Sequence, residues 1–295
     1  MSISRQTLTA VIVTFKSEKV IHDCIKSIPK DIKIIIVDNS NDEKFKENLE
    51  KKYSNITCIL SPRNLGMGAG NNLGLRNVKT DFAIILNPDI VLQEDSIEEI
   101  INCSKKIDSY SILAPLSINE KYPNYKVYKE HLANFENPFK VKSVDGFAML
   151  LNLKRINQIE SFKDFNYFDS NIFMYLENDD LCKRLNENNE NIFIVPKSKI
   201  KHLGAKAVDQ IYSHEIELSR NWHWIWSKFY FNKKHYGFFY AFLKGLPGFL
   251  SAVLKLVIYS LINKKEKKEI YQKRVFGFIK ALQGKSSSYR PNIKI

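Results

Sequence analysis

The sequence lacks the features of disulfide-stabilised proteins and of cysteine-based zinc proteins. It has four cysteines in 295 residues, widely spaced and without a Cys-x-x-Cys pair, which excludes a disulfide framework and a zinc site of that kind. It also lacks an amino-terminal series of basic, apolar and small residues typical of a secretion signal, and it has no internal repeat or low-complexity segment. We therefore expect a folded protein in a reducing, cytoplasmic location.

Acidic residues are scarce in the last part of the chain. Residues 228–295 contain 13 Lys, 2 Arg and 2 Glu, so they account for the whole net charge of +13. Residues 1–227 contain 30 basic and 30 acidic residues and are neutral. A nucleic-acid-binding protein would combine such a basic region with a base-reading motif, and none of the standard motifs is present, so we expect no nucleic-acid partner. A basic region that is also aromatic and apolar favours contact with an anionic membrane surface.

A hydrophobic content of 44% and an aromatic content of 12% are sufficient for a full core, and the apolar residues occur in short runs. Four of these runs predict buried strands, over residues 7–15, 32–38, 56–60 and 82–86. Polar stretches between them predict helices, one with Ser17 as its N-cap and another over residues 42–53. Ser96 and Glu99 form a capping box for a further helix. Strands that alternate with helices at this spacing predict an α/β protein with a parallel sheet.

Asn87, Pro88 and Asp89 directly follow the fourth predicted strand. Because proline cannot donate to a sheet ladder, it ends the strand and leaves an amide and a carboxylate at its carboxyl end. Ligands bind at this end of the strands in open α/β sheets, and a carboxylate there suits a divalent cation that holds phosphates. The alternative is an ordinary transition from strand to turn.

A glycine-rich segment, residues 62–74, lies between the third and fourth predicted strands. Gly66, Gly68 and Gly70 permit positive φ and close approach of the backbone, and we expect a short helix to Asn77 after them. A dinucleotide-binding fingerprint follows the first strand of its unit, whereas this segment follows the third, so we do not interpret it as one. An ordinary loop is the alternative.

Four polar motifs thus follow the predicted strands in order: Thr14-Phe15, Val37-Asp38-Asn39, Arg63-Asn64-x-Gly66-x-Gly68-x-Gly70-Asn71-Asn72 and Asn87-Pro88-Asp89. Together they resemble the inverting glycosyltransferases of family 2. More narrowly, they resemble the bacterial branch with rhamnosyltransferase-like and galactofuranosyltransferase-like members. The resemblance extends to about residue 227, and it implies a GT-A fold, a nucleotide-sugar donor and a divalent metal, Mn²⁺ or Mg²⁺.

The resemblance implies a role for each motif residue. The donor-binding residues would be Thr14, Phe15, Asp38, Asn39, Arg63, Asn64, Gly66, Gly70, Asn71 and Asn87. Asp38 would accept a hydrogen bond from the base of the nucleotide, and the N3–H of uracil or thymine suits it, so we expect a UDP- or dTDP-sugar. Asp89 occupies the last position of the family's Asp-x-Asp metal motif, in which Asn87 replaces the first aspartate.

The second half of the chain contains the candidate catalytic residues. The family's Glu-Asp-x-Asp pattern corresponds here to Glu177-Asn178-Asp179-Asp180, at the start of a predicted helix. Inverting transfer needs one carboxylate to accept the proton of the acceptor hydroxyl, and we assign this role to Glu177, with Asp180 as the second candidate. Helix capping is the alternative for these acidic residues.

His202 follows Glu177 by 25 residues. Members of the galactofuranosyltransferase-like group have a metal-binding histidine at this place, so the resemblance implies that His202 and Asp89 hold the metal together with the diphosphate. A structural role for this single histidine is the alternative. The apolar segment 144–151 is similar to the one that lines the acceptor side in this family.

Residues 241–262 form a long apolar run, which follows Trp222, Trp224 and Trp226. The run could cross a membrane, but two internal lysines and a Gly-Leu-Pro-Gly break at 245–248 favour an interfacial hairpin or a re-entrant wedge. A helical pair packed on the main domain is the alternative. Because the candidate catalytic residues precede this run, we expect a chain cut after about residue 232 to lose anchoring and keep its chemistry.

These observations predict three segments: a nucleotide-sugar-binding half (1–106) and an acceptor-binding, catalytic half (107–227) of a GT-A domain, and a basic helical extension (228–295) that associates with a membrane. We expect a metal-dependent inverting glycosyltransferase at the cytoplasmic face of the bacterial inner membrane. Its acceptor would be a polyprenyl-diphosphate-linked glycan of a cell-surface polysaccharide (O-antigen or capsule), and its donor a sugar nucleotide such as dTDP-rhamnose. The alternatives are a transferase for a soluble or protein acceptor, and an inactive nucleotide-binding or membrane scaffold.

Overall fold

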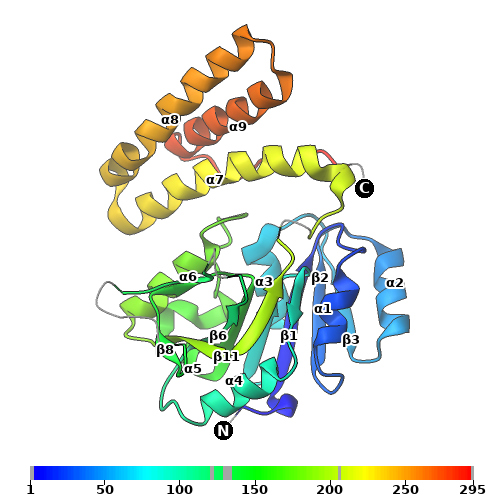
Figure 1. The fold of residues 1–295 in the computed structure, drawn as a ribbon. Helices are drawn as coiled ribbons and strands as arrows, with labels where there is room; N and C mark the ends of the chain where they lie inside the picture. The colour runs from blue at the N-terminus through cyan, green and yellow to red at the C-terminus, as the bar shows by residue number, and fades with distance from the viewer. Residues whose placement is uncertain (1–2, 120–122, 129–134, 205–206, 294–295) are drawn as a thin grey trace. The chain divides into compact units, whose positions relative to one another are not determined.

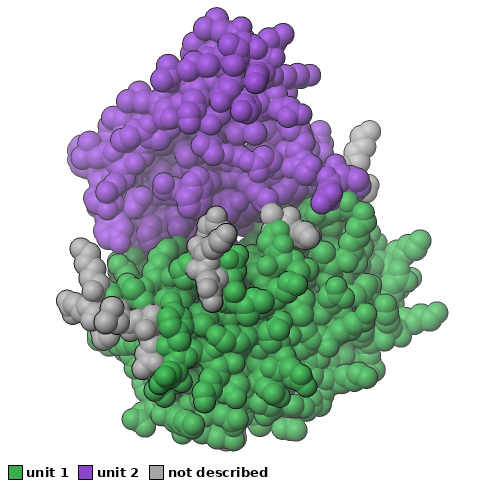
Figure 2. All heavy atoms as spheres, in the orientation of Figure 1, with its two compact units in different colours: residues 1–169, 178–209 green, residues 170–177, 210–295 purple. Residues whose placement is uncertain are grey.

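The structure, a computed structural model, describes residues 3–119, 123–128, 135–204 and 207–293. The chain divides into two compact units (Figure 2): a first unit, Met1–Asp169 and Asn178–Asp209, and a second unit, Ser170–Glu177 and Gln210–Ile295. Each unit therefore consists of two separate stretches of the chain.

The first unit is built around a sheet with helices on both faces (Figure 1). Its first four strands are β1 (Leu8–Thr14), β2 (Lys33–Asp38), β3 (Ile56–Leu60) and β4 (Phe82–Leu86). They are parallel and lie in the order β3-β2-β1-β4. The α/β class and the four strands predicted from the apolar runs are therefore confirmed.

The remainder of the sheet is mixed. It contains β5 (Ile90–Leu92), β6 (Ile112–Ser117), β8 (Phe139–Lys140), β10 (Ala148–Asn152) and β11 (Ile192–His202), while β7 (Tyr125–Lys126) and β9 (Ser143–Val144) form a separate pair. β10 is antiparallel to β4 and β6, and β11 is parallel to β6. Strands β1 to β4, β6 and β11 therefore run in one direction, and their carboxyl ends lie at one edge of the sheet.

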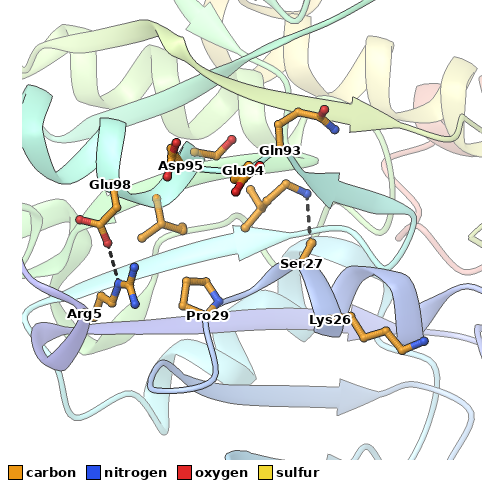
Figure 3. A pocket seen from close by; sticks show the side chains of 11 residues that line it. Arg5, Lys26, Ser27, Pro29, Gln93, Glu94, Asp95 and Glu98 are labelled. Atoms are coloured by element: carbon orange, nitrogen blue, oxygen red, sulfur yellow. Dashed lines mark hydrogen bonds and ion pairs between the residues drawn. The ribbon is translucent and has the colours of Figure 1, made fainter.

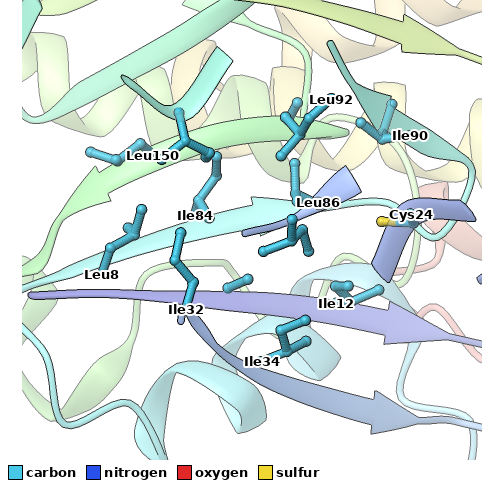
Figure 4. Packing of buried hydrophobic residues seen from close by; sticks show 14 of the residues in the cluster. Leu8, Ile12, Cys24, Ile32, Ile34, Ile84, Leu86, Ile90, Leu92 and Leu150 are labelled. Carbon is cyan, nitrogen blue, oxygen red and sulfur yellow. The ribbon is translucent and has the colours of Figure 1, made fainter. Parts of the chain in front are cut away.

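Helices cover both faces of this sheet. They are α1 (Ile21–Ser27), α2 (Glu43–Lys52), α3 (Gly66–Arg76), α4 (Ser96–Ser104), α5 (Leu153–Ile156) and most of α6 (Glu177–Glu187), with 3-10 helices at Arg5–Thr7 and Glu160–Phe165. Side chains alternate across a strand, so β1 contributes to two layers. Leu8 and Ile12 pack in one cluster with Cys24 of α1 (Figure 4), whereas Val11 packs in the other with Leu75 of α3. Burial on both faces explains why these strands are apolar throughout.

Two helix caps predicted from the sequence are wrong. Ser17 lies four residues before the start of α1, and its hydroxyl accepts a hydrogen bond from the N–H of Phe15 (3.2 Å). Ser96 is the first residue of α4 rather than its cap, and its hydroxyl donates to the carbonyl of Lys199 on β11. In both places another hydrogen bond uses the hydroxyl that a cap would need.

The glycine-rich segment is mainly helix rather than loop. α3 begins at Gly66, which has a positive φ of 81°. Gly70 lies inside α3 against β1, where a Cβ would be only 2.9 Å from Cγ1 of Val13. The predicted close approach is therefore confirmed, but it lets a helix pack on the sheet, and no loop separates the glycines from that helix.

Most of the second unit, from Gln210 to Leu282, is helical. It contains α7 (Ser213–Tyr236), α8 (Phe238–Leu261) and α9 (Lys265–Leu282), preceded by a 3-10 helix at Gln210–Tyr212. Trp222 and Trp226 of α7 pack in one apolar cluster with Phe278 of α9. Gly237, with a φ of 88°, makes the turn between α7 and α8.

The break predicted at residues 245–248 does not occur, because α8 continues through Pro247 as a helix of 24 residues. By length and composition it is the one helix in the described ranges that could cross a membrane. Only 11% of its apolar stretch of 18 residues is buried.

Candidate functional site

Two of the predicted donor-binding residues meet where β1 and β2 end. Asp38 is the last residue of β2 and lies beside Thr14, the last residue of β1, and both are buried. The Thr14 hydroxyl donates to Asp38 Oδ1 (3.0 Å), and the N–H of Asp42 donates to Asp38 Oδ2 (3.0 Å). These bonds fix the carboxylate, and its remaining lone pairs can accept from a further donor.

Asn39 connects this pair to the glycine-rich segment. Its Oδ1 accepts from the N–H of Leu65 (3.2 Å), and its Nδ2 donates to the carbonyl of Gly66 (3.1 Å). Asn64 Oδ1 accepts from the N–H of Gly66 (3.0 Å). The ends of β1 and β2 and the start of α3 therefore form one hydrogen-bonded network, which we call the Asp38 network.

Asn71 follows Gly70 in the second turn of α3. It is buried, and its Oδ1 has no hydrogen-bond partner in the part of the chain that the structure describes. A buried amide oxygen without a partner is unfavourable, so this position suits a donor group of a ligand.

Phe15 and Arg63 lie at the margin of the Asp38 network. Phe15 is half-buried directly after β1, and Arg63 is exposed before α3. The exposed guanidinium of Arg63 is accessible to an anionic ligand.

The two predicted metal residues, Asp89 and His202, come together at the same edge of the sheet. β11 pairs with β5 so that His202 lies opposite Ile90, the residue after Asp89. His202 Nε2 is 3.3 Å from Asp89 Oδ2. The imidazole packs on the ring of Phe147, with centroids 4.3 Å apart.

The residues of this pair fit a divalent cation. Within the described ranges, Asp89 Oδ1 and Asn87 Oδ1 are buried without hydrogen-bond partners. Leaving a carboxylate oxygen in this state costs free energy, which a cation would recover. Neighbouring ligands of an octahedral ion with bonds of about 2.1 Å lie about 3 Å apart, close to the observed separation of Asp89 and His202.

The protein provides only part of such a coordination shell. Among the described residues, no group of three or more His, Cys, Asp or Glu side chains could hold a metal ion. The remaining positions would be left for phosphate oxygens and water, as is usual for Mg²⁺.

Asp145 is a nearby residue to which the sequence analysis gave no role. It lies between β9 and β10, and burial raises the pKa of its carboxyl; the charge of Asp179 adds to this, while Lys126 and His202 oppose it. Asp145 lies two residues before Phe147, whose ring packs on His202, and it is therefore near the candidate metal residues. An Asp-Gly pair directly before an apolar strand was the signal that could have identified it.

The acidic group opens α6, as its sequence predicted. Glu177 is the half-buried first residue of the helix, and Asp180 follows within the first turn, fully buried. Asp180 Oδ2 accepts from Arg184 Nε (2.9 Å), and Arg184 also donates to the carbonyl of Tyr167. Asp180 is therefore part of a buried ion pair.

The segment before α6 belongs to the second unit and contacts α7. The Ser227 hydroxyl donates to the carbonyl of Met174 (2.7 Å). The ring of Tyr175 meets the ring of Trp224 edge-on, with centroids 5.4 Å apart. We call residues 170–177 the entry segment, because the chain enters α6 through it.

The backbone of the entry segment is strained directly before Glu177. Tyr175 and Leu176 both have positive φ, 70° and 68°, which is unfavourable for residues with a Cβ. Such strain persists only where the surroundings hold the backbone in place. The contacts with α7 therefore determine how the chain arrives at Glu177.

The carboxyl-terminal residues support the same segment. His223 of α7 is buried and stacks on Phe173, with centroids 4.5 Å apart. Its Nε2 donates to the carbonyl of Tyr289 (2.9 Å), and its Nδ1 accepts from the Ser287 hydroxyl (2.9 Å). The guanidinium of Arg290 lies 3.8 Å from the centre of the Phe173 ring. Burial lowers the pKa of His223 from 6.5 to about 3, so this histidine is neutral.

A cavity of about 260 Å³ lies elsewhere in the first unit (Figure 3). Arg5, Lys26, Pro29 and Glu98 are among its lining residues, and Arg5 Nε donates to Glu98 Oε1 there (2.6 Å). None of the predicted site residues lines this cavity, so it is not the candidate site.

The sequence pattern described as Glycosyl transferase family 2 matches residues 9–180. Among curated proteins, the low-salt glycan biosynthesis hexosyltransferase Agl10 of Haloferax volcanii is 26% identical in an alignment 203 residues long, and the match covers 63% of each chain. The uncharacterized glycosyltransferase RP339 of Rickettsia prowazekii is 34% identical over 85 residues, 28% of this chain and 26% of that protein. The chain thus spans 63% or less of the length of these relatives.

Two solved structures resemble the whole chain. S. aureus TarS has a TM-score of 0.51 and 14% identity, over 96% of this chain and 93% of that one. The mannosyltransferase PcManGT of Pyrobaculum calidifontis, solved with GDP-Man and Mn²⁺, has a TM-score of 0.56 and 10% identity, over 95% and 88%. At these identities the likeness concerns the fold, and it confirms the predicted GT-A type. Since the family pattern covers more than half of the chain, from β1 to the acidic start of α6, the protein belongs to glycosyl transferase family 2.

Proposed function

We propose that this protein transfers a hexose from a nucleoside-diphosphate sugar to a glycan acceptor, with inversion at the anomeric carbon. The pairing of Asp89 with His202, at the sheet edge that also carries the Asp38 network, is the observation on which the proposal rests. Membership of family 2 supports glycosyl transfer. The Haloferax volcanii relative is named a hexosyltransferase of glycan biosynthesis, which supports the choice of sugar class and process.

Asp89 and His202 would hold a divalent cation, Mn²⁺ or Mg²⁺, and Asn87 would add a buried amide oxygen nearby. A cation bound there would neutralise charge on the diphosphate as it leaves. The presence of Mn²⁺ and GDP-Man in the Pyrobaculum structure supports this assignment, since that protein has the same fold.

Glu177 is the proposed general base. The acceptor oxygen attacks the anomeric carbon, the bond between that carbon and the diphosphate breaks, and the hydroxyl proton passes to Glu177. Asp180 is the weaker candidate, because it is fully buried and bound to Arg184. A half-buried carboxylate at the start of a helix can meet an acceptor that arrives from solvent, whereas an enclosed ion pair cannot.

Asp38 is proposed to select a pyrimidine nucleotide. Thr14 and Asp42 already orient its carboxylate by hydrogen bonds, and its remaining lone pairs can accept the N3–H of uracil or thymine. Cytosine lacks that proton, and guanine presents a different edge. We therefore propose a UDP- or dTDP-sugar as donor, dTDP-rhamnose being one example, in keeping with the narrower resemblance to rhamnosyltransferase-like and galactofuranosyltransferase-like members.

We further propose a polyprenyl-diphosphate-linked glycan as acceptor, at the cytoplasmic face of the bacterial inner membrane, in the synthesis of a surface polysaccharide such as O-antigen or capsule. The basic charge of residues 228–295 supports this, because a lipid-linked acceptor requires an enzyme that works at a membrane surface.

Release of nucleoside diphosphate from a panel of UDP-, dTDP- and GDP-sugars tests the proposal. We expect release from a UDP- or dTDP-hexose with Mn²⁺, loss of release with EDTA, and faster release with a polyprenyl-diphosphate-linked saccharide. Donor binding without release under every condition would indicate a scaffold and contradict the proposal. Acceleration by a soluble glycan but not by the lipid-linked one would contradict the proposed acceptor.

A further inference from the structure

One side of α8 exposes a row of large apolar side chains. Phe239, Leu243, Leu250, Leu254 and Leu261 are exposed by 82, 67, 57, 61 and 81%. They are separated by four or seven residues, so they lie on the same side of the helix. The row extends over about 33 Å, because a helix rises 1.5 Å per residue. We call it the apolar stripe.

The opposite side of α8 is covered by its own unit. Ala241 and Ala252 are buried. A Cβ on Gly245 would lie 2.5 Å from the ring of Phe278 on α9, and Phe249 stacks on the same ring with centroids 4.8 Å apart. The helix therefore has two apolar sides, and only one of them is used for packing among the described residues.

Two lysines lie along one flank of the stripe. Lys244 directly follows Leu243, and Lys255 directly follows Leu254, so both are rotated from the stripe in the same direction. Lys244 Nζ lies 5.7 Å from the centre of the Tyr240 ring, and Lys255 Nζ lies 5.3 Å from the centre of the Tyr271 ring. Amines paired with tyrosine rings beside an apolar surface are typical of the boundary between headgroups and acyl chains.

The charge around the stripe has one sign. Residues 238–282 contain nine basic and two acidic residues, and one of the acidic ones, Glu269, pairs with His214 (2.9 Å). An anionic surface complements this charge. A second copy of the chain would instead bring an equal positive charge to the stripe, which opposes self-association.

We propose that α8 lies in the plane of an anionic lipid surface, with the apolar stripe among the acyl chains and Lys244 and Lys255 at the level of the phosphates. A helix that stood upright would place these two lysines at depths about 16 Å apart, since eleven residues separate them. In the plane both have the same depth, and neither has to enter the hydrocarbon. This inference does not depend on the proposed sugar transfer.

Flotation of the full chain with lipid vesicles tests the surface. We expect binding to phosphatidylcholine vesicles that contain phosphatidylglycerol, and at least tenfold weaker binding to pure phosphatidylcholine at low salt. The double variant Leu250→Ser, Leu254→Ser should lose most binding at low and at high salt. The double variant Lys244→Gln, Lys255→Gln should lose binding at low salt only, because salt screens charge and not apolar contact.

Two control variants carry similar substitutions at exposed positions of the first unit. Ile118→Ser removes an apolar side chain that is 48% exposed in the first unit, and Lys51→Gln with Lys52→Gln removes two exposed lysines of α2. Both controls should float like the unchanged chain. The proposal is overturned if the unchanged chain stays unbound at low salt, or if the leucine variant binds as well as its control. It is also overturned if size-exclusion chromatography shows a dimer that the leucine variant alone dissociates.

Spin labels measure the orientation of α8. The four native cysteines are buried, and burial raises the pKa of the Cys182 thiol to about 12, so a thiol-specific label reacts with them slowly. Phe239→Cys, Leu250→Cys and Leu261→Cys, labelled one at a time, should show equal immersion depth in anionic vesicles. A depth that changes steadily from Phe239 to Leu261 would mean that the helix spans the bilayer, and it would overturn the in-plane arrangement.

Discussion

His202 is held from two directions, by the ring of Phe147 and by the carboxylate of Asp89. Asp89 provides the carboxylate ligand and His202 the imidazole ligand of the candidate metal site. We therefore expect Asp89→Asn and His202→Gln each to abolish Mn²⁺-dependent donor binding. Isothermal titration calorimetry with and without Mn²⁺ measures this. Asp108→Asn, at an exposed position of the first unit, should leave the affinity unchanged. If metal-dependent affinity survives in both site variants, these residues do not hold the metal.

Glu177 and Asp180 lie in one helical turn and differ in their surroundings. Glu177→Gln should lower turnover roughly 10²–10⁴-fold with little change in donor affinity, because an amide cannot accept the proton. Asp180→Asn leaves Arg184 without its buried carboxylate, and loss of one partner of a buried pair costs about 3–5 kcal/mol of stability. Single-turnover kinetics and thermal unfolding separate the two effects. Loss of turnover in Asp180→Asn at an unchanged melting temperature, with Glu177→Gln nearly as active as the unchanged chain, would reverse the assignment.

His223 makes the second unit sensitive to acid. Its pKa is lowered by burial from 6.5 to about 3, so between these values the unfolded chain binds a proton that the folded chain does not. Stability is therefore complete above pH 6.5 and falls as the pH decreases toward about 3, with a loss of about 2 kcal/mol at pH 5. Thermal unfolding followed by tryptophan fluorescence should show this slope. His223→Gln should flatten it, while His235→Gln, at the end of α7, should keep it.

Ser227 forms a hydrogen bond that links helix α7 to the entry segment. Ser227→Ala leaves the carbonyl of Met174 without this donor, at a cost of about 1–3 kcal/mol. If about 1.4 kcal/mol of this cost is added to the activation free energy of sugar transfer, kcat falls about tenfold. The donor KM should stay the same. Ser260→Ala is the control, because Ser260 donates to the carbonyl of Leu256 in the same way on exposed α8. Equal kcat in both variants would show that α7 does not position Glu177.

Elements whose burial is recorded in their own run of residues could be predicted from the sequence. Strands β1, β2 and β4 are buried on both faces, and this requires the continuous apolar runs that identified them. Ser96 was misinterpreted, and the position of Gly70 inside a helix was not predicted, because their partners are distant in sequence, Lys199 on β11 for the first and Val13 on β1 for the second. A capping pattern and a glycine pattern carry no information about such partners.

The division of the molecule into two units changes the outcome expected for a shortened chain. A cut after Asn232 would remove Ser287, Tyr289 and Arg290, which support His223 and Phe173 beside the entry segment. We therefore expect the shortened chain to lose turnover, contrary to the expectation from sequence. Metal-dependent donor binding should remain, because the residues assigned to it belong to the first unit, and calorimetry of that binding also reports whether this unit has folded. Unchanged turnover would restore the sequence-based expectation.

The candidate site was predictable to the extent that its residues lie in motifs. The resemblance identified Asp38, Asp89 and His202, and the structure places the last two 3.3 Å apart. It could not predict that α7 and the carboxyl terminus hold the backbone before Glu177. Those contacts join residues more than 50 positions apart, such as Met174 and Ser227, and no local pattern records them.

The entry segment is also synthesised well before the carboxyl-terminal residues that contact it. A ribosome makes the chain from the amino end at about 5–20 residues per second, so the synthesis of Arg290 follows that of Phe173 by on the order of 10 s. Once His202 has been made, the residues assigned to metal and donor binding are present, while Phe173 still lacks Arg290, whose guanidinium contacts its ring in the structure. We expect a chain on which synthesis stalls in this window to bind a sugar nucleotide without transferring its sugar. The synthesis of residues 287–290 is thus the step after which we expect sugar transfer to begin.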